Sequence, residues 1–161
     1  MDRCESAPCK ITPHRGPAAY PLGIALSSVE NFRLLVSKLA TELASLGFRR
    51  RGVWFTKVSS EGAAFACINI RKIPQVNSKR IVFQIVGYGG RVASPSQPLI
   101  TSMSQAVECS AMEQRIMEGQ VEKFWTVWPS SNVSELSDSV SLQVSQQLLP
   151  PLEDYLRRSN A

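Results

Sequence analysis

The sequence is poor in the residues that most enzymes use for proton transfer. It has one histidine, His14, and three aspartates, Asp2, Asp138 and Asp154. A Ser-His-Asp or Cys-His arrangement needs a histidine that a rigid scaffold holds against the nucleophile, and His14 lies in a Pro-rich N-terminal stretch. The composition therefore disfavours nucleophilic hydrolysis and favours a function without catalysis.

Long apolar segments are also missing. No run approaches the roughly 20 residues that span a bilayer. A secretory signal needs a basic start followed by an unbroken apolar stretch, but Cys4, Glu5, Ser6 and Pro8 occupy that place. We therefore expect a cytoplasmic protein that does not interact with a membrane.

The cysteines are few and scattered, at Cys4, Cys9, Cys67 and Cys109. Such scatter does not suggest a disulfide framework and favours reduced thiols. Cys4, Cys9 and His14 are evenly spaced, but a fourth metal ligand is missing and the spacing is not that of a zinc finger. We expect no bound metal and no cofactor.

The chain of 161 residues has the length of a single domain. Residues 1–23 show neither a helical nor a strand period, and they carry four of the ten prolines at nearly regular intervals, Pro8, Pro13, Pro17 and Pro21. This composition predicts a mobile tail. The remaining residues, 24–161, are predicted to form one domain.

The domain is predicted to begin with an amphipathic helix over residues 27–46. Apolar residues recur there every three or four positions, at Val29, Phe32, Val36, Leu39, Leu43 and Leu46. Ser27 and Glu30 have the spacing of a capping box at the start. Gly47 can adopt the left-handed conformation that ends a helix, with Phe48 folding back onto the last turn.

Strand-favouring patterns follow a basic turn, Arg49-Arg50-Arg51-Gly52. They occupy residues 53–58, 64–70, 80–88, 111–117 and 123–128. The connections are mostly too short for parallel crossovers, which favours an antiparallel meander of about five strands. The last two runs are predicted to pair as a hairpin around Glu118-Gly119-Gln120, whereas residues 89–107 suggest a long loop or a short helix.

A second amphipathic helix is predicted near the C-terminus. Asn132 has the position of an N-cap with Glu135 three residues later, and Val133, Leu136, Val140, Val144 and Leu148 form one stripe. Pro150 and Pro151 are expected to end this helix before a short terminal one. An open sheet needs its apolar face covered, so we predict an α+β fold in which the N-terminal and C-terminal helices cover the sheet.

Several of these features together resemble a mainly bacterial family, number four-three-zero-four of the domains of unknown function. The resemblance covers residues 29–156 and rests on Leu46-Gly47-Phe48, Arg49-Arg50-Arg51-Gly52, Trp54-Phe55, Arg115-Ile116, the pair Trp125 and Trp128, and Leu149-Pro150-Pro151-Leu152. It implies the fold and a bacterial, cytosolic origin. It implies no activity, because the family has none established.

Two motifs resemble signatures of chemical sites but are better explained as structure. Gly87-Tyr88-Gly89-Gly90-Arg91 follows a strand, but no Lys-Ser or Lys-Thr follows it, so we expect a strand end or turn and not a phosphate-binding loop. Four glutamates cluster in the sequence, Glu108, Glu113, Glu118 and Glu122. Nothing places two of them across a cleft, so a solvated acidic hairpin is expected.

Charge is strongly segregated along the chain. Residues 49–91 contain nine basic residues and one acidic residue, a net charge of +8, whereas residues 108–161 contain eight acidic and four basic residues, a net charge of −4. Such an arrangement can attract an acidic partner or nucleic acid, or it can serve only to keep strand ends and turns soluble. The candidate binding residues are Arg49, Arg50, Arg51, Trp54, Arg71, Lys72, Arg80 and Tyr88.

Two functions remain open. The first is a protein-binding module, of inhibitor or immunity type, that binds an acidic protein partner with the open face of the sheet. The alternative is an RNA- or DNA-binding domain in which Arg49, Arg50, Arg51 and Arg80 contact phosphates while Trp54 or Tyr88 stacks on a base. Aromatic residues do not recur on one face of adjacent strands, which favours the first function.

Overall fold

A computed structural model describes residues 26–76, 79–92 and 100–160 of the chain. The elements, in chain order, are α1 (Ser28–Ser45), β1 (Arg49–Arg51), β2 (Trp54–Val58), β3 (Ala64–Ile73), β4 (Ile81–Arg91), α2 (Met103–Glu108), β5 (Ser110–Arg115), β6 (Met117–Glu118), β7 (Val121–Glu122), β8 (Trp125–Val127), α3 (Val133–Gln143), the π-helix η1 (Val144–Leu148) and α4 (Leu149–Arg158). The predicted tail, residues 1–23, lies outside the described residues, as do Cys4, Cys9 and His14.

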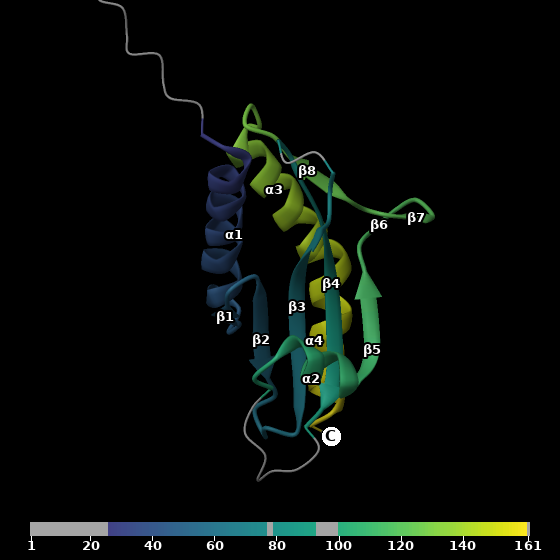
Figure 1. The fold of residues 1–161 in the computed structure, drawn as a ribbon. Helices are drawn as coiled ribbons and strands as arrows, with labels where there is room; N and C mark the ends of the chain where they lie inside the picture. The colour runs from purple at the N-terminus through teal and green to yellow at the C-terminus, as the bar shows by residue number, and fades with distance from the viewer. Residues whose placement is uncertain (1–25, 77–78, 93–99, 161) are drawn as a thin grey trace, which may run out of the picture.

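The elements form an antiparallel sheet with helices, which confirms the predicted α+β fold (Figure 1). The first four strands pair in the order β1-β2-β3-β4. The long strand β4 then has two neighbours on its other side: β8 pairs with Ile81–Phe83 and β5 pairs with Val86–Gly90. All five predicted strands are present, and β1 is an additional one.

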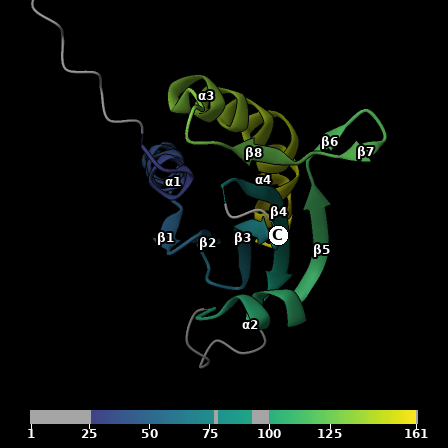
Figure 2. The ribbon, with the colours of Figure 1, turned by 45° about the horizontal axis from the view of Figure 1, so that its top comes forward.

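One face of the sheet carries the main hydrophobic core. The α1 helix and the continuous run α3-η1-α4 lie side by side on this face (Figures 1 and 2). Their apolar side chains bury Phe55 of β2, the even-numbered residues of β3 from Ala64 to Ile70, and Phe83 and Ile85 of β4. Strands expose alternate residues to opposite faces, so the odd-numbered residues of β3 belong to the second face.

The α1 helix begins and ends as predicted. The Ser27 hydroxyl accepts a hydrogen bond from the Glu30 amide at 3.2 Å, and a Glu30 carboxylate oxygen accepts one from the Ser27 amide at 2.8 Å. Gly47 has a φ of 88°, and the Phe48 amide donates to the Leu43 carbonyl at 3.0 Å. Local chemistry therefore fixes both ends of this helix.

The buried stripe of α1 differs from the predicted one at its ends. Val29 and Leu46 are exposed, whereas Leu35 is fully buried. The first turn buries Asn31 in place of Val29, because the Asn31 side chain donates from Nδ2 to the backbone carbonyls of Trp128 and Pro129 at 2.9 and 3.2 Å. The buried face of this turn therefore includes the hydrogen-bonded Asn31 and not the apolar Val29.

Three other local predictions were wrong. The basic turn contains the short strand β1, whose residues Arg49–Arg51 pair with β2. The two arms of the predicted hairpin, β5 and β8, both pair with β4, and only the small β6-β7 hairpin between them has the expected turn. Pro150 and Pro151 lie in the first turn of α4 and do not end the helix, because η1 shifts the hydrogen-bond register there and an N–H in a first turn has no partner within the helix.

Candidate functional site

The second face of the sheet is only partly covered. Phe65 and Cys67 of β3 and Val86 and Tyr88 of β4 form a smaller core there with Ala106 of α2 and with Ile100. Figure 2 places α2 on the side of the sheet opposite α3 and α4. The α2 helix therefore covers one end of this face and leaves the part near β1 and β2 accessible.

The accessible part carries basic residues around one tryptophan. The pairing register aligns Arg51, Trp54 and Asn69 across β1, β2 and β3. Arg49 and Arg71 lie on the same face, since each is two residues along its strand from a member of this row. We call the set Arg49, Arg51, Trp54, Asn69 and Arg71 the open face.

Trp54 is the aromatic centre of the open face. It is half-buried because one side packs against the smaller core of the second face. The Arg51 guanidinium carbon lies 5.8 Å from the centre of its ring, a cation–π distance. The indole is therefore held in place while part of it remains in contact with solvent.

The three arginines of the open face lack acidic neighbours within the described part of the chain. Among residues 26–76, 79–92 and 100–160, no carboxylate lies within salt-bridge distance of Arg49, Arg51 or Arg71. The other edge of the second face, at β5, does contain acidic residues that pair with an arginine. There the Arg115 guanidinium binds Glu113 at 2.6 Å and Glu122 at 2.5 Å, and these hydrogen bonds raise the pKa of Arg115.

Two of the predicted binding residues face the other way. Arg50 is paired with Phe55, which belongs to the helix-side core, and its Nε donates to the Gly52 carbonyl at 2.9 Å. Lys72 is paired with Phe83, and its Nζ lies 4.7 Å from the centre of the Phe32 ring on α1. Neither side chain belongs to the open face.

The other two predicted residues lie apart from the open face. Arg80 donates to the Gln75 side-chain oxygen at 3.1 Å, and its guanidinium carbon lies 5.5 Å from the centre of the Trp128 ring. Tyr88 is on the second face but only 7% exposed. Burial, with a smaller contribution from Glu113, raises the pKa of its hydroxyl. A ring this covered has no free surface on which a base can stack.

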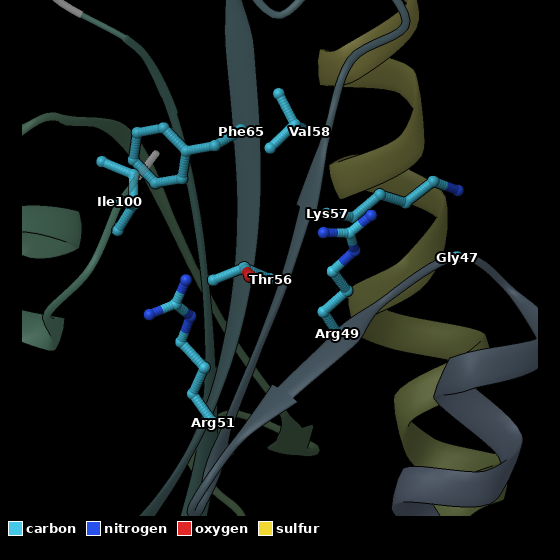
Figure 3. Close-up of a pocket in the computed structure, with 8 residues that line it drawn as sticks. All are labelled: Gly47, Arg49, Arg51, Thr56, Lys57, Val58, Phe65 and Ile100. Carbon is cyan, nitrogen blue, oxygen red and sulfur yellow. The ribbon is translucent and has the colours of Figure 1, made fainter. Parts of the chain in front are cut away.

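A pocket of about 280 Å³ opens at the β1 end of the open face (Figure 3). Its lining residues come from the α1-β1 junction, three strands and the segment before α2: Gly47, Arg49, Arg51, Thr56, Lys57, Val58, Phe65 and Ile100. Figure 3 shows the two arginine side chains directed toward the end formed by Val58, Phe65 and Ile100. Apart from Arg49 and Arg51, the lining residues were not predicted as site residues, because no local pattern brings them together.

Other chemistry has little support in the described part of the chain. Residues 26–76, 79–92 and 100–160 contain no group of three or more His, Cys, Asp or Glu side chains placed to hold a metal ion. Burial raises the pKa of the Cys67 thiol to about 12, and its Sγ lies 3.5 Å from Met103 Sδ. This thiol is protonated at neutral pH and is not a nucleophile.

The glycine-rich sequence after Gly87 lies inside β4 and forms no loop. None of the helices in the described ranges is both long and apolar enough to cross a membrane. Comparison of the chain with protein-family models, with curated proteins and with solved structures finds no match. The resemblance to the domain-of-unknown-function family stays a prediction, and the geometry of the open face and its pocket is the main guide to function.

Proposed function

We propose that the protein is a non-enzymatic binding module that takes an acidic protein partner on the open face. The observation that carries this proposal is the group of arginines without acidic neighbours among the described residues, Arg49, Arg51 and Arg71, beside the half-buried Trp54. Trp and Arg are the residues that most often dominate the energy of protein interfaces. An acidic partner would supply counter-charges to the three arginines.

The distribution of aromatic residues supports a protein partner over nucleic acid. Single-stranded nucleic acid is usually held by successive bases stacked on several exposed rings. Trp54 is partly exposed, but Tyr88 is covered, and Phe65 is fully buried under the segment that precedes α2. Trp54 is the one ring in the open face as defined above, which suits an anchor in a protein interface better than a stacking surface.

We also propose a cytoplasmic location, which fits an inhibitor or immunity type of function against an intracellular target. Cys67 and Cys109 both have free thiols, and Cys67 is buried in the smaller core. Free thiols are the usual state in a reducing compartment. A location in the cytoplasm also restricts the partner to proteins of the same compartment.

Photo-crosslinking tests the partner class. A photoreactive phenylalanine analogue placed at Asn69, next to Trp54 in the register, should capture an acidic protein in the native host. The same analogue at Leu142, an exposed position of α3, is the control and should not capture it. The purified partner should then bind the protein directly, and binding should weaken when Arg51 and Arg71 are replaced by Gln.

The nucleic-acid alternative predicts a different result. If Arg49, Arg50 and Arg51 contacted phosphates of a single strand, replacing all three by Gln would lower the magnitude of the negative slope of log affinity against log salt by about 0.7 for each phosphate that is no longer neutralised. We expect no saturable binding to RNA or single-stranded DNA at physiological salt. Sub-micromolar binding that the triple variant abolishes, or RNA captured at Asn69, would reject the protein-partner proposal.

A further inference from the structure

The pocket at the end of the open face has two chemically different ends. The arginines of β1, Arg49 and Arg51, project from one face of the strand, roughly 7 Å apart at their backbone positions. The other end is apolar (Figure 3): half-buried Val58 provides its accessible surface, and the buried side chains of Phe65 and Ile100 lie beside it. The Thr56 side chain lies between the two ends. A ligand that fills this pocket therefore carries both a negative charge and an apolar group.

The pocket also contains a free strand edge. β1 pairs only with Trp54, Phe55 and Thr56, so within the described ranges the last two residues of β2 have no strand beside them on this side. The Ser59 amide donates to Ala64 on the β3 side at 2.8 Å. Peptide groups alternate along a strand, so the N–H and C=O of Val58 point away from β3 and toward the pocket. They are placed to bind another main chain.

Lys57 contributes less to the basic end than the two arginines. Its Nζ lies 3.5 Å from a Glu153 carboxylate oxygen and 5.6 Å from the centre of the Phe48 ring. Its charge is already balanced. Arg49 and Arg51 have no such carboxylate among the described residues, and two guanidinium groups can bind the two oxygens of a carboxylate with good geometry.

We propose that this pocket binds the C-terminal residue of the partner protein. The terminal carboxylate lies between Arg49 and Arg51, the side chain of an apolar last residue packs on the accessible side of Val58, and the main chain hydrogen-bonds to Val58. Capture of a C-terminal carboxylate and addition to a strand edge are both known modes of peptide recognition. The pocket volume of about 280 Å³ suits one residue, since sites for larger ligands begin near 300 Å³.

This proposal rests on the proposed function, because it assigns the same partner a specific end. Phosphate as the ligand is less well supported, since a phosphate group would use the arginines and leave the apolar end unfilled. A free small carboxylic acid would fill both ends but would not use the strand edge at Val58. These two ligands are therefore the contrasting outcomes of the test.

Peptide binding to the full-length protein tests the proposal. A fluorescently labelled acidic hexapeptide that ends in leucine should bind, and its C-terminal amide should bind about tenfold more weakly or worse, because the amide loses charge-assisted hydrogen bonds. The same peptide ending in aspartate should also bind more weakly, since it cannot fill the apolar end. Inorganic phosphate and N-acetyl-leucine serve as competitors and should displace the peptide only at much higher concentration.

Variants then locate the site. Replacing Arg49 and Arg51 together by Gln should remove the difference between the acid and the amide peptide. Arg50→Gln is the matched control, since Arg50 has the same charge on the same strand but faces the opposite way. It should leave that difference intact. Thermal melting of each variant establishes that it is folded.

Several results would overturn the proposal. The acid peptide could fail to bind, or the acid and the amide peptide could bind equally well. Arg50→Gln could weaken binding as much as the double variant does. Phosphate or N-acetyl-leucine could displace the labelled peptide as effectively as the unlabelled peptide does. The crosslinking at Asn69 tests the proposed function and not the pocket. Capture of an acidic protein there, with no effect of C-terminal amidation, would leave the proposed function standing and reject the pocket assignment alone.

Discussion

Cys67 illustrates how burial alone sets the chemistry of a side chain. It lies in the smaller core of the second face with Phe65, Val86 and Tyr88. The raised pKa of its thiol, about 12, has burial as its cause. The folded state therefore favours the protonated thiol more strongly than the unfolded state does, where the pKa is about 8.5.

This pKa difference predicts both reactivity and pH dependence. Iodoacetamide should label Cys67 only after unfolding in denaturant, as mass spectrometry of the digested protein can show. The stability from the protonated thiol is fully present below pH about 8.5 and is lost as pH rises toward the folded pKa of about 12. Cys67→Ala should show a smaller loss of unfolding free energy over this alkaline range than the wild type. Rapid labelling of native Cys67 would contradict the assigned burial.

Gly90 shows a close approach that only glycine permits. It lies at the irregular register between β4 and β5. A Cβ at this position would meet the Cys109 carbonyl oxygen at 2.1 Å and the Phe65 ring at 2.6 Å. A backbone atom cannot move aside as a flexible side chain can, so the space is closed to any larger residue.

We therefore expect Gly90→Ala to destabilise the protein by roughly 3 kcal/mol, the upper end of the usual cost of overpacking. Gly62→Ala is the control, since nothing lies within 4 Å of its added Cβ and only its φ of 72° is unfavourable. That strain should cost about 1 to 2 kcal/mol. Urea unfolding measures both, and a Gly90 variant no less stable than the Gly62 variant would contradict the close approach.

At the scale of elements, α1 has two faces whose residues can be compared directly. Leu39 is 2% exposed and packs in the main core, whereas Leu34 is 47% exposed. Both are leucines in the middle of the same helix, so helix propensity cancels in the comparison. Only burial differs.

Leu39→Ala should lower the free energy of unfolding by about 2 to 5 kcal/mol, because it leaves a cavity in the core. Leu34→Ala should change it by no more than about 0.5 kcal/mol. Urea midpoints of the two variants are the measurement. Similar midpoints would mean that the helix packs with a different face from the one described.

The C-terminal helical run has an irregular turn with an identifiable role. Within η1, the Gln147 side chain donates from Nε2 to the Met117 carbonyl at 2.9 Å and accepts from the Met117 amide at 2.8 Å. A side-chain amide thus pairs with the backbone of β6 as a neighbouring strand would. This pair attaches the base of the β6-β7 hairpin, which projects from the sheet in Figure 1, to the helical layer.

At the scale of the whole molecule, the sheet separates two cores of unequal size. The main core draws its residues from Phe32 to Leu156, and the smaller one from Phe65 to Ala106. Among the described residues, every buried apolar residue of both cores thus lies between positions 32 and 156. The cap of α1 at Ser27 is the first feature of the described chain with a structural role.

Deleting residues 1–23 should leave the melting temperature within about 2 °C of that of the full chain, since a segment without an apolar period is expected to bury little area and the described core residues and the cap of α1 all lie outside it. Metal analysis of the full chain belongs to the same experiment. A zinc content near one per chain that Cys9→Ser abolishes, or a large fall in melting temperature after the deletion, would assign the N-terminal segment a structural role.

The open face could be predicted only in part. The sequence pointed to Arg49, Arg51, Trp54 and Arg71, because basic residues are concentrated after α1. It did not separate them from Arg50 and Lys72, since that separation follows from strand alternation and β1 was not recognised as a strand. The charge of a residue can be read from the chain, but the face on which it lies depends on which strand it pairs with.

What the sequence by itself determined is local. Each of the features that it predicted correctly depends on residues within a few positions of one another. These features are the capping box at Ser27, the glycine cap at Gly47, the five strand patterns and the amphipathic helices, and all are present in the structure. The α+β class follows from their order, because two amphipathic helices must cover an open apolar sheet.

Tertiary structure decided the rest. Four features depend on contacts between distant segments. They are the pairing of both β5 and β8 with β4, the burial of Asn31, the cover of the second face by α2, and the pocket at the end of the open face. Such contacts form where the strands pair in register, the buried polar groups are hydrogen-bonded and the side chains fill the space between the elements. No short stretch of this chain contains that information, because each partner lies dozens of residues away.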